Sequence, residues 1–167
     1  MQPNEMTIRA GGLEHHVLEW LPAGPAPDTT VLCCHGYLDI GRSWRPVAER
    51  LVEAGRRVVA FDWRGHARTE WIGAGGYYYF TDYIADLADM IDALVPGRLH
   101  LVGHSMGGGV AIHYAGAFPD RVERLVVMEG LGPPWAPKRL PRRPPGRPES
   151  GQWDPMEGPW ATIGTEK

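Results

Sequence analysis

The pattern of apolar and polar positions divides most of the chain into short alternating segments. Four nearly continuous apolar runs, each ending at a turn signal, are typical of strands buried on both faces: residues 30–35, 57–62, 99–104 and 122–129. Three segments between them have helical periodicity: residues 43–55, 81–95 and 106–118. This order of strands and helices predicts the α/β class, with a mostly parallel sheet and helices on both faces.

Two of the helical segments have a recognisable end or face. In residues 43–55, Ser43 is placed as an N-cap and Gly55 as the stop. In residues 81–95, the apolar side chains form one stripe, made of Ile84, Leu87, Ala88, Ile91 and Leu94 or Val95. We expect the stripe to pack against the sheet.

The two ends of the chain differ from this alternating region. Residues 6–10 and 13–21 flank Gly11-Gly12 and predict a β-hairpin. Residues 133–167 contain nine of the 16 prolines and almost no branched aliphatic residues. Proline fixes φ and removes a backbone donor, so we expect a disordered or loosely attached tail there, after a domain that ends near residue 132.

Composition and charge exclude several classes of function. The net charge of −3 gives no reason to expect a nucleic-acid partner, and no apolar run is long enough to span a bilayer. The N-terminus lacks the pattern of a signal peptide, which predicts a cytoplasmic protein. Cys33 and Cys34 are adjacent and should point to opposite faces of a strand, so we expect free thiols. No metal-ligand cluster or phosphate loop is visible, so we expect neither a metal nor a cofactor.

The first candidate for chemistry is the serine of Gly103-His104-Ser105-Met106-Gly107. It lies between a predicted strand and a predicted helix, where a sharp turn would raise its side chain above the carboxyl edge of the sheet. Gly103 and Gly107 allow that turn to close. The amide of Met106 would lie at the helix N-terminus, where a negative oxygen is stabilised.

Two further stretches end strands at the same edge. His35-Gly36-Tyr37 follows residues 30–35, so the N–H of Tyr37 would supply a second oxyanion donor while His35 braces the turn. Asp62 and Arg64 follow residues 57–62, and we expect them to fix their loop through hydrogen bonds and an ion pair.

Together, HGYLD (35–39), DWRGHARTEW (62–71) and GHSMGGGVA (103–111) resemble the α/β-hydrolase superfamily in order and spacing, and most closely its single-domain bacterial esterases and lipases. The resemblance covers roughly residues 5–132. It implies acyl transfer with Ser105 as nucleophile and the amides of Tyr37 and Met106 as oxyanion donors. One small departure is Ala67, where the family usually has glycine.

The larger departure concerns the histidine and the acid of the family's triad. The family's base lies near the C-terminus, whereas the histidines of this chain are His15, His16, His35, His66, His100, His104 and His113. His66 is the best placed of them, but none is a convincing base. Glu129 ends the last predicted strand, and VVMEGLGPP resembles the triad-acid position of haloalkane dehalogenases. It would orient a histidine, bind its own loop or face solvent.

Two classes of function therefore remain open. One is a serine hydrolase acting on a small-molecule ester or related acyl bond, with the catalytic histidine absent from this chain. The other is a truncated, non-catalytic relative that binds a ligand or partner, or a product of a shifted reading frame. In either case the sheet would stop after about its sixth strand and leave residues 122–129 as an edge open to self-association.

Overall fold

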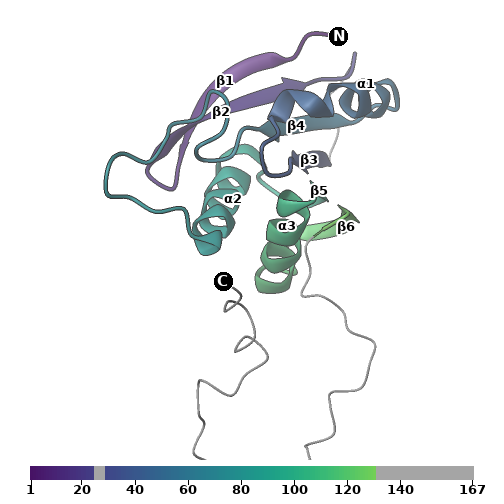
Figure 1. Cartoon of the computed structure of the whole chain (residues 1–167). Coiled ribbons are helices and arrows are strands. Elements are labelled where there is room, and N and C mark those ends of the chain that lie inside the picture. Colours follow the sequence, from purple (N-terminus) through teal and green to yellow (C-terminus); the bar gives the residue numbers. More distant parts are fainter. Residues whose placement is uncertain (25–28, 131–167) are drawn as a thin grey trace, which may run out of the picture. The chain divides into compact units, whose positions relative to one another are not determined.

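The structure of the protein is a computed structural model that describes residues 1–24 and 29–130 (Figure 1). The predicted disordered tail, residues 133–167, and the predicted boundary at residue 132 lie outside the described residues.

One sheet of six strands organises the described residues. The strands are β1 (Asn4–Ala10), β2 (Leu13–Trp20), β3 (Thr30–Cys34), β4 (Arg57–Phe61), β5 (Leu99–His104) and β6 (Val122–Met128). Their order in the sheet is β1-β2-β4-β3-β5-β6. The predicted hairpin β1–β2 joins β4 antiparallel, while β4, β3, β5 and β6 run parallel to one another. The predicted α/β class with a mostly parallel sheet is therefore confirmed.

Three α-helices cover the two faces of the sheet, as predicted. They are α1 (Arg45–Glu53), α2 (Phe80–Leu94) and α3 (Met106–Ala117). In Figure 1, α2 and α3 lie side by side below the sheet and α1 lies above it. A parallel sheet needs this double cover because its crossover helices bury both faces of the strands.

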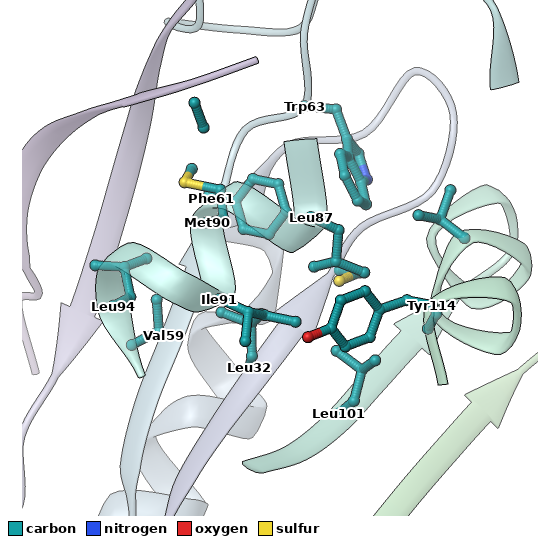
Figure 2. Close-up of a cluster of buried hydrophobic side chains, with 14 of the residues drawn as sticks. Leu32, Val59, Phe61, Trp63, Leu87, Met90, Ile91, Leu94, Leu101 and Tyr114 are labelled. Atoms are coloured by element: carbon teal, nitrogen blue, oxygen red, sulfur yellow. The ribbon is translucent and has the colours of Figure 1, made fainter. Parts of the chain in front are cut away.

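Alternation along the strands separates the two cores. In β3, Leu32 and Cys34 face the larger core under α2 and α3, whereas Val31 and Cys33 face the smaller core under α1. Figure 2 shows part of the larger core, where side chains of α2 and α3 meet those of β3, β4 and β5. Both cysteines are free and buried, as expected for strand neighbours that point in opposite directions.

The start of α1 differs from the prediction. Ser43 is not its N-cap; it lies in a 3-10 helix, Gly41–Trp44, that leads directly into α1, and its hydroxyl donates to Asp39. The physical reason lies in the sequence of the first turn. An N-cap at Ser43 would accept from the backbone N–H two or three residues later, but the Arg45 N–H donates to the Arg42 carbonyl and Pro46 has no N–H. The predicted stop is correct, since α1 ends before Gly55, which has φ +77°.

The sheet ends at β6 within the described part of the chain. β6 pairs with β5 on one side only, and three of its apolar side chains are well exposed: Leu125, Val126 and Met128. This arrangement matches the expected open edge.

Candidate active site

Ser105 lies on the tight turn between β5 and α3. Its backbone has φ 49° and ψ −117°, a conformation that residues other than glycine rarely adopt. The turn is held on both sides, because the Ser105 N–H donates to the Met128 carbonyl (2.9 Å) and the Ser105 carbonyl accepts from the Gly109 N–H (3.1 Å). Backbone strain that is fixed in this way is characteristic of functional turns.

The glycines on either side of Ser105 are required by close backbone packing. A Cβ at Gly103 would lie 2.5 Å from the Gly107 carbonyl oxygen. A Cβ at Gly107 would lie 2.5 Å from the carbonyl oxygens of both Cys34 and His35. Only residues without a Cβ allow α3 to start this close to β3, which brings the two strand ends together.

The same close packing brings the loop after β3 to Ser105. A Cβ built on Gly36 would lie 3.2 Å from the Ser105 Cβ, so the backbone beside Tyr37 faces the serine. Among the described residues, no acceptor receives a hydrogen bond from the N–H of Tyr37 or of Met106. The sequence-predicted oxyanion donors therefore lie in the two segments that flank Ser105.

His35 is a buried brace between two loops at this edge. Its Nδ1 donates to the Gly36 carbonyl (2.7 Å) and its Nε2 accepts from the Trp63 N–H (3.0 Å), while the indole N–H of Trp63 donates to the His35 carbonyl (2.9 Å). Burial lowers the pKa of His35 to about 4, so the ring is neutral and can accept at Nε2. Neither ring nitrogen of His35 hydrogen-bonds to the serine.

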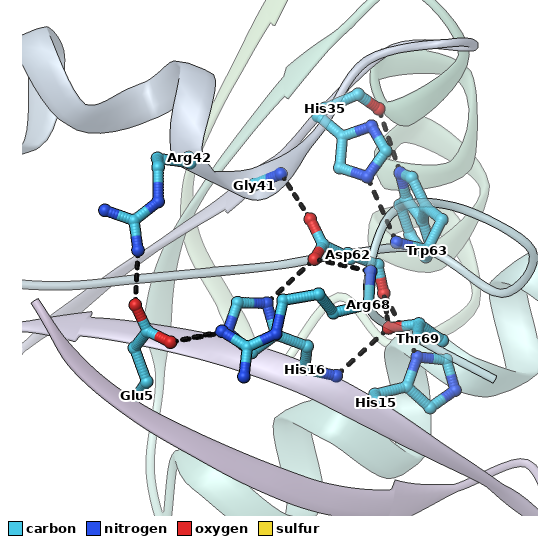
Figure 3. A network of polar contacts seen from close by, with 10 residues as sticks. All are labelled: Glu5, His15, His16, His35, Gly41, Arg42, Asp62, Trp63, Arg68 and Thr69. Atoms are coloured by element: carbon cyan, nitrogen blue, oxygen red, sulfur yellow. Dashed lines mark hydrogen bonds and ion pairs between the residues drawn. The ribbon is translucent and has the colours of Figure 1, made fainter.

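Asp62 joins three segments rather than bracing only its own loop (Figure 3). Its carboxylate accepts from the Gly41 N–H (2.7 Å) and from Nδ1 of His16 (2.8 Å). His16 in turn contacts Glu5, which also pairs with Arg42 and Arg68. Its hydrogen bond from Arg68 holds the pKa of Glu5 below its usual value.

Sequence reasoning misses this network. The predicted hairpin contains His16 but indicates no polar partner for it, and no pattern singles out Glu5. A weak signal existed, because a histidine in the middle of a strand that is covered on both sides needs a polar partner. The partner itself is 46 residues away, so no local pattern identifies it.

Arg64 corrects the expected ion pair. Its guanidinium does not pair within the loop; it donates twice to Asp86 of α2 (2.6 Å each) and pairs with Asp82 (3.2 Å). Asp86 is fully buried, so a charged partner is needed to hold it there. The carboxylates of Asp82 and Asp86 lie one helical turn apart on α2, so both can bind Arg64 and hold the loop after β4 against the helix.

None of the seven histidines of the chain, all of which are described, makes a hydrogen bond with Ser105. Both ring nitrogens of His66 are engaged: one with the Arg64 carbonyl (3.0 Å), the other with the Leu38 N–H (3.4 Å). His104 follows Gly103 but lines a separate cavity with Asp39. The structure therefore places Ser105 beside the segments that carry the two candidate amides. No histidine hydrogen-bonds to Ser105, although Nδ1 of His104 lies 3.1 Å from the Cβ position of Gly36, which is also 3.2 Å from the Ser105 Cβ.

Glu129 lies where the sequence placed it, directly after β6 and next to the strand that carries Ser105. It is exposed and has φ 49°. Within the described part of the chain its carboxylate has no hydrogen-bond partner. The geometry thus agrees with a carboxylate presented at the sheet edge, and the role of Glu129 stays a prediction.

Residues 1–24 and 29–130 contain neither a candidate metal site nor a helix suited to a membrane. No cluster of three or more histidine, cysteine or acidic side chains that could hold a metal ion occurs among them. No helix in the same part of the chain has both the length and the apolar character needed to cross a bilayer.

Comparison with known proteins identifies the family. Residues 29–149 match the model of the alpha/beta hydrolase fold. A serine hydrolase-like protein of Dictyostelium discoideum is 32% identical over 129 residues, and the lipase LipV of Mycobacterium tuberculosis is 36% identical over 117 residues. An epoxide hydrolase from Vigna radiata superposes with a TM-score of 0.68 at 29% identity, covering 75% of this chain and 40% of its own. The chain belongs to the α/β-hydrolase fold family.

The match is partial in length. The aligned segments cover 77% and 70% of this chain but only 35% and 42% of the Dictyostelium and Mycobacterium proteins. The family match also continues to residue 149, beyond the boundary near residue 132 that was expected from composition. The relatives include a lipase and an epoxide hydrolase, which cleave different kinds of bond. Membership of the family therefore does not identify a substrate.

Proposed function

We propose that the site at Ser105 belongs to a hydrolase that cleaves small-molecule esters or related acyl bonds, with Ser105 as the nucleophile. The observation that carries the proposal is the isolated serine on a strained turn, held between β5 and α3 with the backbone of Gly36 beside it. A nucleophile must be reachable by its substrate, and Ser105 is half-buried at the carboxyl edge of the sheet, where the start of α3 adds a favourable field for negative charge.

The chemistry follows from the positions of these groups. The Ser105 oxygen attacks the ester carbonyl carbon while its proton passes to a base, and the carbonyl oxygen becomes an anion held by the N–H groups of Tyr37 and Met106. Collapse of this intermediate breaks the bond to the alcohol, which leaves with a proton and gives an acyl-serine. Water then releases the acid. Glu129 would orient the histidine that acts as base.

The second candidate function is a non-catalytic relative that binds a ligand or partner. The contacts of the seven histidines favour it, because a serine without a base stays a neutral alcohol. The oxyanion donors alone would leave on the order of 10³-fold catalysis over water, far below the roughly 10⁶-fold or more of a working enzyme.

The experiment that separates the two candidates supplies the missing base from solution. p-Nitrophenyl acetate hydrolysis is measured with and without added imidazole for the full chain, for Ser105→Ala and for the control Ser43→Ala, which removes an exposed serine hydroxyl elsewhere in the chain. If Ser105 is the nucleophile, imidazole accelerates the full chain and Ser43→Ala beyond its effect on Ser105→Ala, and mass spectrometry finds acetyl on Ser105. Equal rates for all three proteins, with no acetyl-serine, would establish the non-catalytic alternative.

Two further proposals concern the cellular location of the chain and its association with a second copy. The buried free thiols Cys33 and Cys34 support a reducing, cytoplasmic location. The apolar edge strand β6 supports association of two copies through their sheets. Neither a nucleic acid nor a membrane is proposed as a partner.

A further inference from the structure

A small aromatic cavity opens beside the loop after β3, at the side of Tyr37. Its volume is about 230 Å³. It is lined mainly by rings from three segments that are distant in sequence: Tyr37, His66, Trp71, Tyr78 and Tyr83. No residue of the turn that carries Ser105 lines it, and the two sites share only Tyr37, which gives its ring to the cavity and its N–H to the candidate oxyanion site.

The floor of the cavity is fixed and the rim is open. Tyr83 and His66 are buried, and the His66 ring lies edge-on to that of Tyr37 at 5.9 Å. Tyr37 and Trp71 are each 67% exposed at the rim. Apolar rings that remain this exposed around a hollow indicate a surface that another molecule covers.

Three polar groups of the cavity are already engaged. The Tyr78 hydroxyl accepts from the Ile72 N–H (3.0 Å), and His66 is bonded at both nitrogens. The Arg64 guanidinium is taken up by Asp86 and Asp82. An occupant therefore gains little from these three groups and is selected mainly by its shape and by its contact with the rings.

The charge around the cavity and the volume of the cavity further limit which molecules can bind in it. A cation would meet Arg64, and an anion would meet an arginine whose charge two carboxylates already compensate. An apolar cavity of about 150 Å³ accommodates benzene, so one of this size fits a substituted ring or two fused rings. Aromatic rings also prefer edge-to-face contacts, which saturated rings of the same size cannot make.

We propose that this cavity is a binding site for a neutral, planar aromatic group of one or two rings. The site does not require the Ser105 hydroxyl, and the lining residues named above all belong to the described part of the chain.

The test uses 2-naphthol as the probe, with the full chain and ligand-detected NMR titration. We expect binding that weakens about five-fold or more for decahydro-2-naphthol and for 2-naphthoate, the saturated and the anionic counterparts. Trp71→Ala should weaken 2-naphthol binding by a similar factor. The matched control is Tyr77→Ala, because Tyr77 is also 67% exposed and lies outside the cavity.

Circular dichroism and thermal unfolding confirm that both variants fold. Ser105→Ala should bind 2-naphthol as the unmodified chain does, which separates this proposal from the proposed hydrolase function. Absence of binding up to the solubility of the probe, equal affinity for the saturated ring, or equal losses in Trp71→Ala and Tyr77→Ala would each overturn the proposal.

Discussion

At the scale of single residues, backbone strain marks one edge of the sheet. Four non-glycine residues among those described have positive φ: Leu38, Ala67, Ser105 and Glu129. Each lies in the loop that follows one of the four parallel strands, β3, β4, β5 and β6 in that order. Such conformations cost about 1–3 kcal/mol each and persist where the surroundings enforce them. Their concentration at the carboxyl edge agrees with a site there, since open α/β sheets bind ligands at this edge.

Residue identities were predictable where the reason for them is local. Ser105 and its flanking glycines follow from a five-residue spacing, and the structure shows the packing that the spacing serves. The partners of Asp62 and Arg64 were not predictable. They are 46 and 22 residues away, in His16 and Asp86, and depend on sheet register and on the rotation of α2.

The brace at His35 predicts a pH dependence of stability. Burial lowers its pKa to about 4, below the ordinary value of about 6.5. Between these values the unfolded chain binds a proton that the folded chain excludes, so stability is fully present above about pH 6.5 and is lost as the pH falls towards 4. From pH 7 to pH 5 we expect His35 to cost about 2 kcal/mol of unfolding free energy.

Urea unfolding of the chain and of His35→Gln at both pH values checks this. Glutamine can accept from the Trp63 N–H but does not titrate, so the variant should start less stable and lack the additional loss. The pKa of Glu5 is held low by Arg68, so any loss of stability from protonation of Glu5 occurs below the pH 5 to pH 7 range of this experiment. If both proteins lose the same free energy, or if NMR shows His35 protonated at pH 6, the brace does not work as described.

At the scale of elements, periodicity located every strand and α-helix of the described region, but it missed the 3-10 helix Gly41–Trp44 and the start of α1. The cap expected at Ser43 does not form, because Pro46 has no N–H and the Arg45 N–H donates to the Arg42 carbonyl. The spacing of apolar positions determines which face of an element is buried, whereas caps and close contacts decide where it begins.

The glycines of α3 predict a contrast within one helix. In Gly107→Ala the new Cβ would lie 2.5 Å from two backbone carbonyl oxygens, which cannot move without separating α3 from β3. We expect a loss of about 2 kcal/mol or more in unfolding free energy. Gly116→Ala is the control in the same helix, because nothing lies within 4 Å of its Cβ position. Alanine there should gain up to about 1 kcal/mol from helix propensity.

Chemical unfolding of both variants measures the two effects on one scale. Equal stability changes at the two positions would contradict the close approach of α3 to β3. A destabilised but folded Gly107→Ala should also show altered NMR shifts at His35, whose carbonyl the new methyl group would meet.

At the scale of the whole molecule, the described sheet is protected at one edge and open at the other. At the hairpin edge, the outer strand β1 contacts α2 and carries Glu5, which is paired with Arg42 and Arg68. At the opposite edge, β6 presents apolar side chains together with unpaired backbone groups of its outer side. Natural edge strands usually avoid this combination, because it templates pairing with another strand.

We therefore expect the chain to self-associate through β6. Two copies related by a two-fold axis would pair their edges antiparallel and cover Leu125, Val126 and Met128. Val126→Lys places a charge in the middle of the edge and should shift the chain towards the 18.5 kDa monomer. Leu21→Lys is the matched control, since Leu21 is similarly exposed but directly follows β2, which lies towards the opposite edge of the sheet from β6.

Sedimentation velocity over a concentration series measures the result. The unmodified chain and Leu21→Lys should show a sedimentation coefficient that rises with concentration, whereas Val126→Lys should stay near the monomer value. Association through an edge is cooperative along the strand because each backbone hydrogen bond aligns the next, so one charge at its centre suffices to disrupt it. A monomeric unmodified chain throughout the series, or association that both lysine variants retain, would show that β6 is not the contact.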